Sequence, residues 1–115
     1  SLQTMLYGGV EAEFLDRDGR INALLTADSA RIDDNSGNMC ATGLVVVYSP
    51  RNRTRVETVR LCYEKEEGML RSEQRVVVDD SLRGRHIEGT GFESDESLGV
   101  YTFFNVTGRA RSIDR

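Results

Sequence analysis

The chain has 115 residues, of which 38% are hydrophobic and 30% charged, and this composition favours one globular domain over residues 1–115 rather than a collagen-like or disordered chain. Its net charge of −4 disfavours nucleic acid or an anionic membrane surface as the main partner. The sequence has no apolar run long enough to span a membrane and no signal-peptide pattern at its start, so we expect any anchor or signal to have been removed or never to have existed.

An internal repeat of 31 residues organises the sequence. Three successive units align apolar residues and glycines, namely Leu25 with Val56 and Ile87, Ala30 with Leu61 and Phe92, and Gly37 with Gly68 and Gly99. These units cover residues 20–109, and residues 8–17 match the second half of an earlier unit. About three and a half repeats therefore fill the chain.

Each unit is predicted to form two extended arms, because apolar residues recur at every second position and the breaks between arms contain glycine or proline. The phase of this alternation slips between Val56 and Val59, which predicts a β-bulge or a corner there. A bend at the same place in every unit would let each arm contribute to two facing sheets. No helix is predicted, since residues 21–30 could form an apolar helical stripe but the matching residues 56–61 have strand periodicity.

The polar motifs indicate turns and packing rather than chemistry. Residues 16–19 and 33–35 resemble fragments of calcium loops, but neither continues to the glutamate that completes such a loop. Gly89 and Gly91 lack the third glycine of a phosphate-binding motif and indicate close backbone packing or a strand bend. The lone His86 is expected on a solvated face. We therefore predict no enzyme, no cofactor and no metal site.

Alternate arginines occupy one predicted turn and the equivalent place one unit later: Arg51, Arg53 and Arg55, then Arg83 and Arg85. Two interpretations remain open for them. They keep an outer face solvated, or they form a cationic rim that meets phosphate groups of a ligand, since guanidinium groups match phosphate oxygens.

The two cysteines allow two alternatives as well. A hairpin centred on Arg51 places Cys40 opposite Cys62, which predicts a cross-strand disulfide in an oxidising compartment. The bulge predicted between Val56 and Val59 shifts the register by one residue, and this shift would separate the two thiols.

In the order of these features the sequence resembles the LptC family. Members of that family are components of the lipopolysaccharide export machine of Gram-negative bacteria. The resemblance rests on Leu-Thr-Ala-Asp-Ser-Ala-Arg-Ile-Asp at residues 25–33 and on Gly-Thr-Gly-Phe-Glu-Ser-Asp at residues 89–95. It covers residues 6–110, and the stretch 89–108 is most similar to Bacteroidetes-type members. The first motif is shared with the related LptA and OstA domains. The membrane helix or lipid anchor of full-length members is missing from this sequence.

The resemblance implies a half-open β-jellyroll whose apolar interior receives the acyl chains of lipopolysaccharide. It also implies a periplasmic protein tethered to the inner membrane, with its N-terminal end docked on the inner-membrane lipopolysaccharide ABC transporter. The C-terminal end of such a protein passes lipid to LptA by strand addition. No chemistry is performed on the lipid, and a cytoplasmic partner hydrolyses ATP.

The inward positions of the repeat are the predicted lipid-binding residues, and none is charged. They are Leu25, Ile32, Met39, Val45, Val56, Leu61, Tyr63, Leu70, Val76, Ile87, Phe92, Tyr101 and Phe103. The alternative is that these side chains fill a closed core, in a β-repeat scaffold or adhesion domain that acts only through its edge strands.

The last arm, residues 99–106, contains no proline and no charged residue, so it lacks the usual protection of an edge strand. We expect it to pair with LptA or with a second copy of this chain. The predicted partner-binding residues are Val100, Thr102, Phe104 and Val106.

Overall fold

The computed structural model describes residues 2–106 and 111–112, which form ten strands of one antiparallel sheet and contain no helix. The strands are β1 (Gln3–Leu6), β2 (Val10–Leu15), β3 (Ile21–Ala27), β4 (Ser29–Asp33), β5 (Met39–Ser49), β6 (Thr54–Glu64), β7 (Met69–Asp80), β8 (Arg85–Asp95), β9 (Tyr101–Asn105) and β10 (Arg111–Ser112). The predicted all-β fold is therefore confirmed. Within the described residues, no helix has the length and apolarity of a membrane span.

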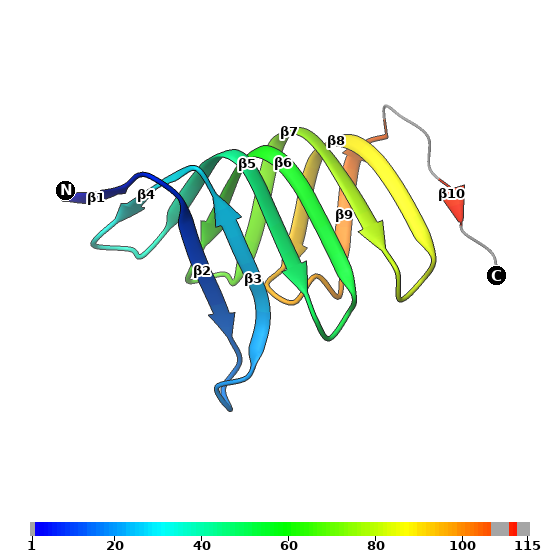
Figure 1. Cartoon of the computed structure of the whole chain (residues 1–115), viewed down its shortest axis with the longest axis horizontal. Coiled ribbons are helices and arrows are strands. Elements are labelled where there is room, and N and C mark those ends of the chain that lie inside the picture. Colours follow the sequence, from blue (N-terminus) through cyan, green and yellow to red (C-terminus); the bar gives the residue numbers. More distant parts are fainter. Residues whose placement is uncertain (1, 107–110, 113–115) are drawn as a thin grey trace.

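The sheet folds over on itself because its four long strands bend, and Figure 1 shows β5 to β8 curving over along the upper side of the molecule. One half of β5 pairs with β3 and the other half with β4, while β8 pairs with β10 at its start and β9 at its end. The first layer contains β2, β3, β10 and residues 45–58 and 75–90. The second layer contains β1, β4, β9 and residues 39–42, 60–72 and 92–95. The bend expected in each long arm is thus observed.

A β-bulge lies at the bend between β5 and β6. Two residues of β5, Gly43 and Leu44, face the single residue Val59 of β6, and an extra residue of this kind bends a strand and increases its twist. The phase slip in β6 falls after Thr58, further along than predicted. Val56 is buried whereas Val59 is 60% exposed, so these two side chains do not share a face.

A second bulge lies one repeat later, where Glu73 and Gln74 of β7 face Gly91 of β8. Gly91 has a φ of 73°, in the region that favours glycine. A Cβ atom on Gly89 would lie 2.3 Å from the carbonyl oxygen of Asn105, so the returning β9 passes too close for a side chain. Both glycines therefore serve backbone packing and a bend, as the sequence indicated.

The strand positions follow the repeat. The bounds of β8 are those of β6 moved by 31 residues. Between the layers, the side chains at the inward positions form one apolar core. The largest of them that are only 0–1% exposed are Leu25, Val45, Val47, Val56, Leu61, Leu70, Val76, Val78, Phe92 and Leu98.

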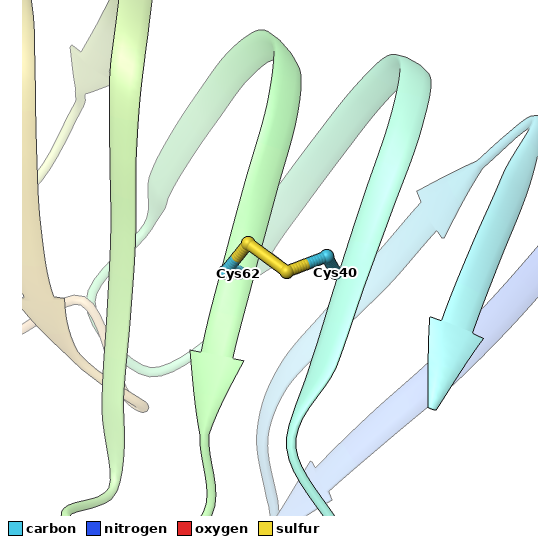
Figure 2. Close-up of a disulfide and its surroundings, with 2 residues drawn as sticks. All are labelled: Cys40 and Cys62. Atoms are coloured by element: carbon cyan, nitrogen blue, oxygen red, sulfur yellow. A yellow bond between two sulfur atoms is a disulfide. The ribbon is translucent and has the colours of Figure 1, made fainter. Parts of the chain in front are cut away.

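A disulfide joins Cys40 of β5 to Cys62 of β6, with the two Cα atoms 4.0 Å apart (Figure 2). The two residues are directly opposite in the strand register. The cross-strand disulfide, one of the two alternatives from the sequence, is therefore the one that the structure contains. The bond ties adjacent strands of the second layer close to the bend.

Candidate functional site

The predicted lipid-binding residues all lie on the inner faces of the two layers. Eight of them are buried, namely Leu25, Met39, Val45, Val56, Leu61, Leu70, Val76 and Phe92. The other five are half-buried, namely Ile32, Tyr63, Ile87, Tyr101 and Phe103. Four of the half-buried residues, Ile32, Ile87, Tyr101 and Phe103, lie towards one or other end of the two layers, while Tyr63 lies on the central strand β6, close to the turn at 65–68.

The centre of the interior is packed by the protein's own side chains. Val45, Val76 and Leu70 are each 0% exposed, so no water-sized space adjoins them. Interiors packed in this way resemble organic crystals and hold few voids larger than a water molecule. A ligand can therefore reach these side chains only if the two layers move apart.

An aromatic contact joins β2, the N-terminal edge strand of the first layer, to β6 in the middle of the second layer. The ring of Phe14 from β2 lies 4.6 Å, centroid to centroid, from the ring of Tyr63 in β6. Tyr63 also donates a hydrogen bond to Glu96 Oε2, and burial followed by the charge of this carboxylate raises the pKa of Tyr63 to about 12. Beyond this pair, Leu6 of β1 is 37% exposed and Ile32 is half-buried. The N-terminal end of the interior, lined by these two residues, is therefore apolar and partly open to solvent.

Near the C-terminal end, polar groups join the layers. The Tyr101 hydroxyl of the second layer donates a 2.7 Å hydrogen bond to Asp80 Oδ2, and Arg83 Nη1 donates to the same oxygen at 2.8 Å. Burial raises the pKa of Asp80, but the hydrogen bonds from Tyr101 and Arg83 outweigh it and hold that pKa below its ordinary value. The buried carboxylate is therefore ionised and fully paired.

The loop at residues 96–100 extends the same connection. Its Leu98 is completely buried, with a φ of 58°, and fills the space between the layers. Asn52 Nδ2 donates to the carbonyl of Ser97 at 2.7 Å, and Arg83 Nη2 donates to the carbonyl of Gly99 at 2.6 Å. We call this set the clasp: Asn52, Asp80, Arg83, Ser97, Leu98, Gly99 and Tyr101.

The two ends therefore differ in how they are held. In the part of the chain that the structure describes, the hydrogen bonds that join the layers away from the bends all belong to the clasp. Among the residues that the structure describes, the contacts between the layers in the N-terminal half of the open side are apolar and aromatic, such as Phe14 with Tyr63. Separation of the layers should begin at the N-terminal end, because fewer directional contacts oppose it there.

The predicted partner-binding residues lie along the edge of the second layer. β9 pairs with β8 alone, so one side of its backbone has no strand partner among the described residues. Val100 is 72% exposed, Phe104 is 62% exposed and Thr102 is exposed as well. Val106 is 54% exposed, and since β9 begins at Tyr101 and ends at Asn105, Val100 and Val106 both lie just outside the strand.

His86 lies on the outer face of β8 between two carboxylates. Its Nδ1 contacts Asp79 Oδ1, and its Nε2 lies 3.2 Å from Glu88 Oε2. The hydrogen bond to Asp79, followed by that to Glu88, raises the pKa of His86. No group of three or more His, Cys, Asp or Glu residues in the described ranges is placed to hold a metal ion.

The clasp and part of the core were not predicted from the sequence. Val47 and Val78 are spaced by one repeat and could have been included on that signal. Phe14 aligns with Val45 and carried the same signal. Asp80 and Leu98 carried no signal that would predict their burial, because an aspartate at a strand end and a leucine in a polar glycine turn are both ordinary surface patterns.

No protein-family model matches the chain, and no curated protein is significantly similar to it. The resemblance to the LptC family therefore rests on the motifs at residues 25–33 and 89–95 themselves.

Proposed function

We propose that the protein is a periplasmic lipopolysaccharide-binding and transfer domain of the LptC kind. It accepts lipopolysaccharide from an inner-membrane transporter, holds the acyl chains between its two layers and passes them to an LptA-like partner. The observation that carries this proposal is the apolar lining of both layers, which reaches partly exposed side chains at the ends, such as Ile32 and Phe103.

The lining favours hydrocarbon over any polar ligand. Each methylene moved from water to an apolar site contributes about 0.8 kcal/mol, so a chain of a dozen carbons gains on the order of 10 kcal/mol before losses. The main loss is the separation of side chains that now pack on each other, such as Val45 and Leu70. Acyl chains replace those contacts with similar ones, so binding and release can be nearly balanced, as a carrier requires.

The path of uptake follows from the contacts between the layers. Acyl chains enter at the N-terminal end, where the Phe14 and Tyr63 rings separate and no interlayer hydrogen bond of the described residues must break. The clasp at the other end keeps the layers together during this motion. The sheet then opens like a hinge along its bends.

Two features support the proposed location and partner. A disulfide such as Cys40–Cys62 forms in oxidising compartments, of which the periplasm is one. The exposed edge of β9 supports strand addition by a partner, because backbone groups without a strand partner recruit another strand.

A second candidate function is a repeat-built scaffold that acts only through its edges. The complete burial of the central side chains favours it, since a closed core needs no ligand. The two candidates differ in whether the inner faces ever contact lipid.

Photo-crosslinking distinguishes them with a matched pair of positions. Ile32, at the N-terminal end, faces the interior and is half-buried, whereas the preceding residue, Arg31, faces outward and is exposed. With benzoyl-phenylalanine in place of Ile32, lipopolysaccharide should be crosslinked on irradiation, and with the same group in place of Arg31 it should not. Equal labelling at both positions, or none at either, contradicts the carrier and leaves the scaffold.

A further inference from the structure

Charge is divided between the turns of the two layers. The first-layer turns are residues 16–20, 50–53 and 81–84, and they hold five arginines and two aspartates. The second-layer turns are residues 34–38, 65–68 and 96–100, and they hold four carboxylates and one lysine. The open side of the fold therefore has a cationic margin on one layer and an anionic margin on the other, although the whole chain is acidic.

The first two of these turns hold four arginines and are joined to each other by an ion pair. We call Arg17, Arg20, Arg51 and Arg53 the arginine lip. Arg51 Nη2 lies 3.4 Å from Asp16 Oδ2, which joins the turn at 16–20 to the turn at 50–53. The other oxygen of Asp16 accepts the backbone N–H groups of Asp18 and Arg20, so this carboxylate mainly serves its own turn.

The guanidinium groups of the other three lip arginines are available to bind a ligand. Arg17, Arg20 and Arg53 are exposed, and no carboxylate of the described residues forms an ion pair with them. Arg83 and Arg55 differ, because the first is bound in the clasp and the second pairs with Glu57. Guanidinium groups of this kind donate paired hydrogen bonds that match the oxygens of a phosphate.

Polarity on the first layer changes in steps from the interior to the lip. In register across β5, β6 and β7, an apolar inward row contains Val47, Val56 and Val78, and the next row towards the turns contains Ser49, Thr54 and Asp80. The turns with their arginines follow directly. A molecule with a hydrocarbon tail and a phosphate head would match this sequence of surfaces from tail to head.

We propose that the arginine lip binds phosphate monoesters carried by the headgroup of the amphiphile whose chains lie between the layers. This inference rests on the proposed function, since it assigns the position of the headgroup in the same site. The acidic turns of the second layer repel phosphate and so place the headgroup on the first-layer side. They also disfavour a long polyanion such as nucleic acid, which would contact both margins.

The test compares two double variants of equal charge. Arg20→Gln with Arg53→Gln alters the lip, and Arg31→Gln with Arg60→Gln alters two exposed arginines on the outer face of the second layer. Each variant and the unaltered chain are titrated with bisphosphorylated lipid A in detergent micelles, with dephosphorylated lipid A, and with inorganic phosphate. Arginine side-chain NMR signals and binding affinity are both recorded.

We expect the lip variant to bind bisphosphorylated lipid A about tenfold more weakly, while the control variant binds like the unaltered chain. All three should bind dephosphorylated lipid A equally. Equal binding of bisphosphorylated lipid A by the lip variant and the unaltered chain overturns the proposal. If the unaltered chain binds neither lipid but its lip signals respond to inorganic phosphate, the proposed carrier function fails and the lip is a site for free phosphate. If no ligand has any effect, both fail.

Discussion

Cys40 lies directly opposite Cys62 because a β-bulge separates these residues from the hairpin turn. Near the turn, Tyr48 pairs with Arg55, and this register continued without interruption would place Cys40 opposite Tyr63. The extra residue of β5 at the bulge moves the register by one and aligns the two thiols. The bulge thus brings the cysteines together, whereas the sequence suggested that it would separate them.

Removal of the disulfide should destabilise the fold. The bond closes a sequence separation of 22 residues, and such a crosslink contributes about 3 kcal/mol, mainly by restricting the unfolded chain. The variant Cys40→Ala with Cys62→Ala should therefore unfold at lower denaturant concentration, as should the reduced native chain. Equal alkylation of native and reduced samples, with unchanged unfolding midpoints, would disprove the bond.

The bulge itself has one tolerant and one intolerant position. Leu44 has a φ of 42° and is 69% exposed. In Leu44→Gly, the relief of backbone strain in the folded state offsets the greater conformational entropy of the unfolded chain. The free energy of unfolding should therefore change by less than about 0.5 kcal/mol. Gly43 has a φ of 76°, and a Cβ there would lie 2.4 Å from Asp28 Oδ2. Gly43→Ala should cost about 2 kcal/mol. Chemical denaturation of both variants measures this contrast, and equal effects would refute it.

Because of the clasp, the free energy of unfolding should decrease as the pH is lowered into the acid range. The folded-state pKa of Asp80 is lowered, since hydrogen bonds from Tyr101 and Arg83 outweigh its burial, so its stabilising effect is complete above the unfolded pKa near 3.8. This contribution is lost as the pH falls through the folded pKa. Tyr101→Phe should cost about 1–2 kcal/mol at pH 7 and less in acid, where Asp80 is protonated. A stability difference that stays constant from pH 7 to pH 2 would contradict this role.

The edge of β9 should be required for association with another strand. Substitution of Val100, Thr102 and Phe104 by lysine places charge along the edge, which is how natural proteins prevent strand addition. Binding to an LptA-like partner, or self-association in its absence, should disappear in sedimentation velocity. Val59→Lys, at an exposed position at the bend of β6, away from the β9 edge, is the control and should associate normally. Unchanged association of the triple variant would contradict strand addition at the edge of β9.

Sequence patterns predicted those parts of the fold that depend on local alternation. The recurrence of apolar residues at every second position predicted the strands. The phase slip near Val59 indicated a bend, since an inserted residue must interrupt the alternation. The exact position of the slip was wrong because Thr58, a polar residue, occupies the last inward position before the bulge. A hydrophobic pattern cannot mark an inward threonine.

The closure of the candidate site depends on contacts between residues distant in sequence. Tyr101 and Asp80 lie on different layers, and neither residue alone signals a partner. Whether Phe14 reaches Tyr63 depends on side-chain volumes and layer separation, which periodicity does not encode. The sequence could therefore indicate an apolar interior but not whether that interior is open or filled.

The central claim is that lipid separates the layers at the N-terminal end, and interlayer distances measured by electron spin resonance test it most directly. Spin labels at Asp18→Cys and Asn35→Cys report on turns of the first and second layers at that end, and labels at Leu82→Cys and Val100→Cys report on the clasped end. With lipopolysaccharide bound, the first distance should lengthen while the second stays constant. An unchanged first distance in a sample that has bound lipopolysaccharide would contradict the account.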